Sequence, residues 1–403
     1  MWEIIRANQR RAALLVVFMA ALLFAVGYGL GELLTPEGGL LGLAAAFVVW
    51  IGLTLAAYFG GDQILLATSG ARRIQKDDHP VLWNVVEEMC IASGLPQMPE
   101  VYIMDEDAPN AFATGRKAER SAVVVTAGLL ERLNRDELQG VVAHELGHIR
   151  NRDVLYMTMV GVMMGTIVIL ADIGMRVLWY GGGRRRTSSD SKGGAEAIVL
   201  VVSLVLLILA PILAQLMYFA LSRRREYLAD ASSALFTRYP EGLASALEKI
   251  AARGLPLKAA NRATAPMYIV NPLKLVGGKL ADLTSTHPPT SERVGILRSM
   301  AGGPVSLALY NDAFRKVTGR VVGVVPAGSV RAAQEVEARR AATPDPRTGI
   351  DRVRQATDAL WRLQQYAFIP CVCGVSLKVP PVHRGREIRC PQCGTPHQAP
   401  QPK

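Results

Sequence analysis

The chain has 403 residues, of which 50% are hydrophobic, and its mean hydropathy is +0.22. This composition is high for a soluble protein and favours a membrane protein with two or three domains. A net charge of +11 is typical of some nucleic-acid binders, but basic residues in a membrane chain more often mark cytoplasmic flanks, which is the interpretation we prefer. Five cysteines, four of them after residue 370, argue against a disulfide framework and for a metal-binding module in a reducing compartment.

Two apolar runs, residues 12–30 and 41–59, open the chain, and at about 1.5 Å per residue each is long enough to span a bilayer. The tail before the first run is basic, with Arg6, Arg10 and Arg11. The turn between the runs lacks Lys and Arg, so the positive-inside rule places the N-terminus and everything after residue 59 in the cytoplasm. A cleaved signal peptide is the alternative for the first run, but a second apolar run follows at once.

The next segment has a soluble composition and begins with an amphipathic helix, Pro80–Ser93, closed by Gly94. Cys90 lies on its apolar face and is expected to be a core residue. Three strand-like runs follow at 101–104, 111–114 and 121–126. An exposed edge of this sheet could pair with an extended peptide backbone, and 121–126 is the expected edge; the alternative is that this run is simply a buried strand.

His144, Glu145 and His148 form an H-E-x-x-H pattern in a predicted helix, which Asn134 and Glu137 can begin as a capping box. Two histidines four residues apart share one helical face, so both imidazoles can bind a single metal ion. Glu145 is then placed to act on a metal-bound water. A chance match, or an ordinary packed helix, is the alternative for the bare pattern.

A catalytic zinc usually takes three protein ligands, and Glu226 is the best candidate for the third. Asp230 follows it at i+4, so on a helix Glu226 could bind the metal while Asp230 orients a liganding imidazole. Glu241 and Glu248 lack such a companion. The alternative for Glu226 is a solvated charge beside three arginines.

Two further apolar runs, 154–171 and 197–221, predict a membrane hairpin that returns the chain to the same side and so allows His148 and Glu226 to meet. Pro211 and Gln215 within the second run indicate a kink and a polar contact inside the bundle. The loop between the runs is basic, against the positive-inside rule, through Arg176, Arg184, Arg185, Arg186 and Lys192. We expect full spanning, with an incompletely inserted hairpin as the alternative.

After the third-ligand segment we expect an amphipathic helix over 231–252 and a loop region over 254–279. The motif His287-Pro-Pro-Thr-Ser-Glu-Arg293 follows, and its prolines can open a helix that runs to Met300. His287 is a candidate for the donor that polarises a scissile carbonyl or stabilises an oxyanion. The alternative is a loop histidine that shapes the start of the helix.

These motifs occur in a specific order: Pro109-Asn-Ala-Phe112, HELGHIRNRD, REYLAD and HPPTSER. Over residues 1 to about 318 the chain resembles the HtpX-type membrane zinc metalloproteases, relatives of the CAAX prenyl proteases. The resemblance implies a mainly α zincin-type fold with a small β-sheet (α+β). It also implies His144, His148 and Glu226 as zinc ligands, Glu145 as general base, and Asp230 as the residue that orients a liganding imidazole.

The remaining chain does not continue this resemblance, and residues 319–365 indicate a linker with one or two helices. Paired cysteines followed by glycine then predict a small ribbon with a structural zinc, whose ligands are Cys371, Cys373, Cys390 and Cys393. His383 and His397 could substitute as ligands, although four thiolates complete a tetrahedral site. Basic residues in the ribbon lack an aromatic platform, so a protein-docking role is favoured over nucleic-acid binding.

The sequence therefore predicts an integral membrane zinc endopeptidase with one catalytic and one structural zinc. Its active site faces the cytoplasm of a bacterium from the inner membrane, and its substrates, which the resemblance alone suggests, are damaged, unfolded or misassembled membrane proteins under stress. The alternatives are a CAAX-type processing protease and a non-catalytic membrane scaffold that presents the ribbon. The expected segments are 1–60, 61–153, 154–221, 222–318, 319–365 and 366–398.

Overall fold

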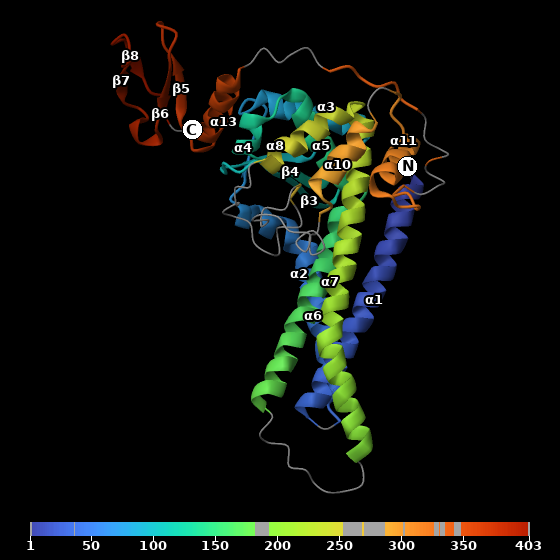
Figure 1. The fold of residues 1–403 in the computed structure, drawn as a ribbon. Coiled ribbons are helices and arrows are strands. Elements are labelled where there is room, and N and C mark those ends of the chain that lie inside the picture. The colour runs from blue at the N-terminus through green and yellow to red at the C-terminus, as the bar shows by residue number, and fades with distance from the viewer. Residues whose placement is uncertain are drawn as a thin grey trace.

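The computed structural model describes residues 2–35, 37–181, 193–252, 268–269, 287–300, 303–325, 330, 335–341 and 348–401. Two predicted features lie outside these residues: the basic loop from Arg184 to Lys192, and, apart from residues 268–269, the loop region 254–279. A bundle of long helices carries a domain in which shorter helices surround a small sheet (Figure 1).

Four long helices form the bundle: α1 (Trp2–Leu34), α2 (Gly39–Ser69), α6 (Asp153–Gly181) and α7 (Gly193–Thr237). Each is long and apolar enough to cross a membrane, which confirms the four predicted apolar runs. Side chains such as Met19, Leu23 and Ile167 are buried between the helices, whereas Leu14 and Val48 remain exposed on the outside. An apolar exterior of this kind is matched to lipid rather than to water.

Helix α7 continues without interruption from the membrane segment through Glu226 to Thr237, and Pro211 lies inside it. The helix expected over 231–252 is divided, because α7 ends at Thr237 and α8 spans Pro240–Ala252. The chain turns at Arg238, whose φ is +55°. Pro240, at the first helical position of α8, disfavours helical backbone in Tyr239, the residue before it. The third-ligand segment is therefore an extension of a membrane helix.

The sheet contains β1 (Arg72–Arg73), β2 (Glu100–Met104), β3 (Ala111–Lys117) and β4 (Arg120–Thr126) in the order β1-β2-β4-β3. Strand β4 is parallel to β2 and antiparallel to β3, so it has a neighbour on each side. The expectation that 121–126 forms an edge is wrong, and the alternative of a buried strand is confirmed; among the described residues the edges of this sheet are β1 and β3. The apolar side chains of β4 are buried on both faces of the sheet, Val123 and Val125 on one face and Val124 on the other.

One face of the sheet packs on α3 (Pro80–Ser93) and α5 (Arg135–Arg150), with Val101, Val123 and Val125 in the shared core. Helix α3 has the predicted bounds; Gly94 closes it at a φ of +67°, and Cys90 is buried as expected. Leu65, from the end of α2, packs with Phe112 and Val124 on the other face of the sheet. A short helix, α4 (Ala127–Arg132), connects β4 to α5.

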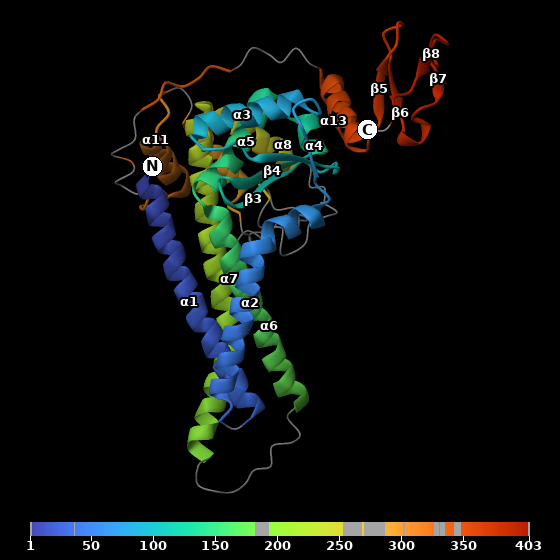
Figure 2. The same ribbon diagram turned by 180° about the vertical axis from the view of Figure 1, so that it is seen from behind.

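The C-terminal part continues with α10 (Thr290–Arg298), α11 (Leu307–Thr318) and α13 (Gly349–Leu363), followed by β5 (Ala367–Pro370), β6 (Ser376–Val379), η2 (Pro381–His383), β7 (Glu387–Arg389) and β8 (Pro396–Gln398). Ala356 and Ala359 of α13 are buried in the main core, so this helix docks on the domain. The two small hairpins extend from α13 on the side away from α11 and the N-terminus (Figure 2).

Candidate metal centre

Helix α5 is fixed at its start by the predicted capping box. The Asn134 side chain accepts a hydrogen bond from the Glu137 amide, and the Glu137 carboxylate accepts one from the Asn134 amide, both at 2.9 Å. Glu137 also accepts hydrogen bonds from Lys249 and Ser245 of α8. The helix that carries the H-E-x-x-H motif is therefore anchored to its neighbour as well as to the sheet.

The structure brings His144, His148 and Glu226 together, as the sequence predicts. Oxygens of the Glu226 carboxylate lie 3.6 Å from Nε2 of His144 and 3.4 Å from Nε2 of His148. One ligand atom from each residue lies within 4.8 Å of the other two, close enough to surround one ion. Gly147 permits this approach of α5 to α7, because a Cβ there would be 3.0 Å from the Ser232 side chain.

Three polar atoms at this centre test whether a metal fits. His144 Nε2, Glu226 Oε2 and Glu145 Oε1 are buried and have no hydrogen-bond partner among the described residues. Buried polar atoms normally have a hydrogen-bond partner. The convergence of these three atoms without one indicates a site for a group that accepts electron pairs, such as a metal ion. Two imidazoles and one carboxylate are the ligands of many catalytic zinc sites, and the residues present fit such an ion.

His144 is oriented by a buried pair of charged residues. Its Nδ1 lies 2.9 Å from Asp230, so it donates to the carboxylate and leaves the Nε2 lone pair available to a metal. Arg293 holds Asp230 through two hydrogen bonds, of 2.7 and 2.8 Å, and lies 3.4 Å from Glu226. Burial opposes the charge on Arg293, but Asp230 keeps the Arg293 pKa above its ordinary value.

His148 is oriented in the same way by a residue at the start of α6. Its Nδ1 is 3.3 Å from the Asp153 carboxylate, and the buried Arg225 donates a hydrogen bond to the Asp153 carbonyl. Burial disfavours the charged imidazole, but the hydrogen bonds with Asp153 and Glu226 outweigh burial and raise the pKa of His148 to about 10. The surroundings therefore stabilise positive charge at the position where a cation would bind.

Glu145 and His287 complete the centre. Glu145 is 1% exposed, and burial raises the pKa of its carboxyl. His287, at the start of the segment that leads into α10, lies with its Nε2 3.9 Å from the Glu226 carboxylate. Burial lowers the pKa of His287, which favours the neutral imidazole. The site thus has a buried carboxylate and a neutral histidine beside the cluster that could bind a metal.

Sequence analysis missed two residues of this site, Arg293 and Asp153. Both lie inside motifs that were recognised, Arg293 as the last residue of HPPTSER and Asp153 as the last residue of HELGHIRNRD. The alternative ligands Glu241 and Glu248 instead bind Arg298 in an exposed ion-pair network.

The four C-terminal cysteines form a second cluster. One Sγ atom from each of Cys371, Cys373, Cys390 and Cys393 lies within 4.8 Å of the others. Gly374 and Gly394, with φ of +86° and +73°, turn the chain after each cysteine pair. His397 Nε2 is 3.1 Å from the Cys371 sulfur, beside the cluster. Hydrogen bonds with Thr395 lower the pKa of Cys393 to about 6, which favours the thiolate form of this one cysteine.

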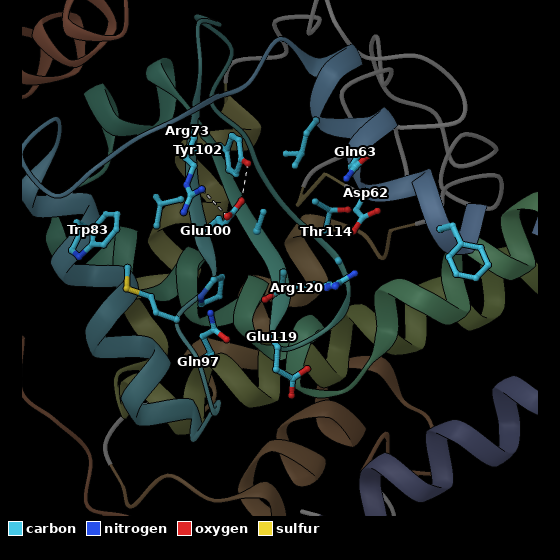
Figure 3. Close-up of a pocket in the computed structure, with 18 residues that line it drawn as sticks. Asp62, Gln63, Arg73, Trp83, Gln97, Glu100, Tyr102, Thr114, Glu119 and Arg120 are labelled. Atoms are coloured by element: carbon cyan, nitrogen blue, oxygen red, sulfur yellow. Dashed lines mark hydrogen bonds and ion pairs between the residues drawn. The ribbon is translucent and has the colours of Figure 1, made fainter. Parts of the chain in front are cut away.

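A separate cavity of about 620 Å³ lies between the end of α2 and the sheet (Figure 3). Its wall includes Asp62 of α2, Glu100 of β2, and Thr114 and Gly115 of β3. Arg73 projects beside it and pairs with Glu100 at 2.9 Å. None of the lining residues belongs to either candidate metal cluster.

The bundle of apolar helices and the helical H-E-x-x-H centre define a membrane protein of the metallopeptidase class. Residues 77–301 match the profile described as Peptidase family M48, and the chain belongs to this family. The resemblance stated from the sequence motifs is thereby confirmed.

Relatives named "Protease HtpX homolog" match most of the chain. The homolog of Dictyoglomus thermophilum is 48% identical over 299 residues, which cover 74% of this chain and 94% of the relative. The homolog of Thermoanaerobacter pseudethanolicus is 42% identical over 74% of this chain and 98% of the relative. The homolog of Pyrococcus furiosus is 41% identical over 72% of this chain and 95% of the relative. A crystal structure of S. mikatae Ste24p has a TM-score of 0.42 and 17% identity, over 73% of this chain and 66% of that one. The similarity to the HtpX homologs and the four apolar helices show a membrane-bound protease.

Proposed function

We propose that the chain is a zinc endopeptidase that hydrolyses peptide bonds at the cytoplasmic face of the bacterial inner membrane. The observation that carries the proposal is the meeting of His144, His148 and Glu226 beside Glu145, in a chain of a peptidase family. A chain that used the metal for structure alone would not need an unpaired carboxylate, such as that of Glu145, buried next to it.

The two histidines and Glu226 would hold the zinc, and a zinc ion bound there would supply Lewis-acid activation of a water molecule and of the scissile carbonyl. Glu145 accepts the proton of the attacking water and returns it to the nitrogen of the leaving amine. The burial that raises the Glu145 pKa makes this carboxylate a better proton acceptor near neutral pH.

His287 and Arg293 have different parts in the proposal. The neutral imidazole of His287 can donate a hydrogen bond to the carbonyl oxygen as negative charge develops on it. Arg293 is a positioning residue, because it contacts Asp230 and Glu226 and holds both carboxylates toward the histidines.

The proposed orientation follows from charge and topology. The domain that contains the metal centre lies at the end of the bundle where α1 begins, α2 ends, α6 begins and α7 ends (Figure 1). The tail of α1 at that end is basic, and basic flanks favour the cytoplasmic side. The helices then cross the membrane in pairs, and the end of α6 and the start of α7 lie on the opposite side.

We propose quality control of damaged or misassembled membrane proteins as the cellular role, on the basis of the similarity to proteases named HtpX homologs. The cysteine cluster would hold a structural zinc through four thiolates, with no open position for substrate. The two hairpins that carry it would then serve to dock a protein partner or substrate.

The direct test is proteolysis of an unfolded soluble protein by the detergent-purified chain. We expect cleavage that a chelator abolishes and stoichiometric zinc restores, with no cleavage by the Glu145→Gln variant. A well-folded, zinc-loaded chain that cleaves neither soluble nor membrane-embedded unfolded proteins would contradict the proposal and favour the scaffold alternative.

A further inference from the structure

Two residues of the chain, Tyr268 and Ile269, lie against the free edge of β3. The Ile269 amide donates a hydrogen bond of 3.0 Å to the Ala111 carbonyl. The ring of Tyr268 packs edge-on against Phe112, with the ring centroids 5.2 Å apart. Because β3 has β4 on its other side only, this is the side on which another strand can be added.

The side chains follow the alternation of a paired strand. Ile269 and Ala111 belong to the core between the sheet and α5, whereas Tyr268 and Phe112 belong to the cluster on the opposite face. Residue 269 thus lies beside 111 and residue 268 beside 112, which is antiparallel order. A peptide that adds to a sheet edge makes this combination of backbone hydrogen bond and alternating side-chain contacts.

The same two residues also contact the metal centre. The Ile269 carbonyl accepts a hydrogen bond of 3.0 Å from Arg293, which is bound to Asp230. The Tyr268 backbone is hydrogen-bonded to His287. Tyr268 and Ile269 are 2% and 1% exposed, so the pair is enclosed between the sheet edge and the proposed catalytic residues.

We propose that Tyr268–Ile269 is an internal substrate mimic, which occupies the substrate edge of β3 and is displaced when a peptide binds. This inference rests on the proposed function. It names the substrate class as extended segments with a bulky apolar pair, an aromatic residue followed by an aliphatic one. Such pairs are buried in folded proteins and exposed in unfolded ones, so the site selects unfolded chains.

The direction of a bound segment also follows from this pairing. In antiparallel order, the residues before the apolar pair extend along the free edge of β3 toward Thr114 and Gly115. These two residues also line the cavity between the sheet and α2, whose wall otherwise comes mainly from α2, β2 and β4 (Figure 3). The internal pair also lowers the apparent affinity for every substrate, because only the displaced fraction of the molecules can bind.

The test is a reversible lock made with Ala111→Cys and Ile269→Cys in the full chain. The two backbones are hydrogen-bonded and both side chains enter the same core, so the two introduced thiols would lie on the same face of the sheet beside each other. We expect the oxidised variant to retain core zinc but lose proteolytic activity, and we expect a reductant to restore this activity. The control is the wild type, treated with the same oxidant and reductant. Failure of the cysteines to bridge, or full activity of the bridged form, would overturn the inference. An inactive wild type would instead overturn the proposed function.

Weakening the mimic should have the opposite effect. We expect Tyr268→Ala to raise kcat/KM for an unfolded substrate by about tenfold, mainly through a lower KM. The matched control is Tyr366→Ala, which removes a tyrosine stacked on Trp361 in the C-terminal part and should leave both constants unchanged. A lower kcat with unchanged KM in Tyr268→Ala would mean that the tyrosine only supports the fold.

The substrate class is tested with two peptides that differ only in a Tyr-Ile or a Ser-Gly pair. We expect wild type to cleave the Tyr-Ile peptide with the higher kcat/KM, and Tyr268→Ala to increase that value further. Equal or reversed preference would overturn the assignment of substrate class.

Discussion

Replacing Arg293 with methionine should destabilise the domain more than any change at an exposed arginine. Arg293 is 1% exposed and binds Asp230 through two hydrogen bonds of 2.7 and 2.8 Å, with Glu226 3.4 Å away. Methionine has a similar length but no charge, so the Asp230 carboxylate would remain buried without its cation. Breaking a buried pair in this way costs about 3–5 kcal/mol. For a domain of this size the melting temperature should fall by about 6–20 °C.

The assay is thermal unfolding of the zinc-loaded, detergent-purified protein, followed by tryptophan fluorescence. Arg298→Met is the matched control, because Arg298 lies on the same helix but pairs with Glu241 and Glu248 at the exposed surface. We expect no measurable change there, since exposed ion pairs contribute little. Arg293→Lys should fall between the two, because an ammonium cannot form the two-pronged contact with Asp230. Equal melting temperatures for Arg293→Met and Arg298→Met would refute the reasoning.

Three further predictions concern the metals and the membrane. Asp230→Ala should weaken core zinc binding by about 10 to 100-fold in a chelator competition, and unchanged affinity would exclude its orienting role. Replacing Cys390 and Cys393 with serine should remove the ribbon zinc and leave proteolysis of a soluble protein mostly intact; loss of all activity in well-folded protein would show that the modules are not separate. Cysteine reporters at the exposed Glu119 and Asp312 should react only with cytoplasmic reagents, and labelling from outside would reverse the proposed topology.

Local signals in the sequence were sufficient for several elements. The bounds of α3 follow from Pro80 and Gly94, and the start of α5 follows from the capping box at Asn134. These features depend on residues a few positions apart, so no knowledge of the fold was needed. The spacing of His144 and His148 was likewise enough to place both imidazoles on one face.

Features that depend on contacts between distant segments were harder to predict. The interior position of β4 was missed because the length and composition of a run do not show which neighbours a strand has, and its pairing with β2 and β3 exists only in the folded chain. The continuity of α7 was missed because the composition changes from apolar to polar after residue 221, and this change was interpreted as a boundary although no break signal interrupts the helix there. Arg293 was missed because 63 residues separate it from Asp230, and only the folded chain brings them into contact.

The central claim is that His144, His148 and Glu226 bind a catalytic zinc while Glu145 transfers the proton. The decisive measurement is zinc content together with peptidase rate for wild type, Glu145→Gln and Glu226→Ala. Glutamine at 145 keeps the shape and all three ligands, so core zinc should stay near the wild-type level while the rate falls by about 10²-fold or more, equivalent to roughly 3 kcal/mol. Alanine at 226 removes a ligand, so core zinc and activity should be lost together. A Glu226→Ala chain that kept its core zinc and full activity would contradict the account.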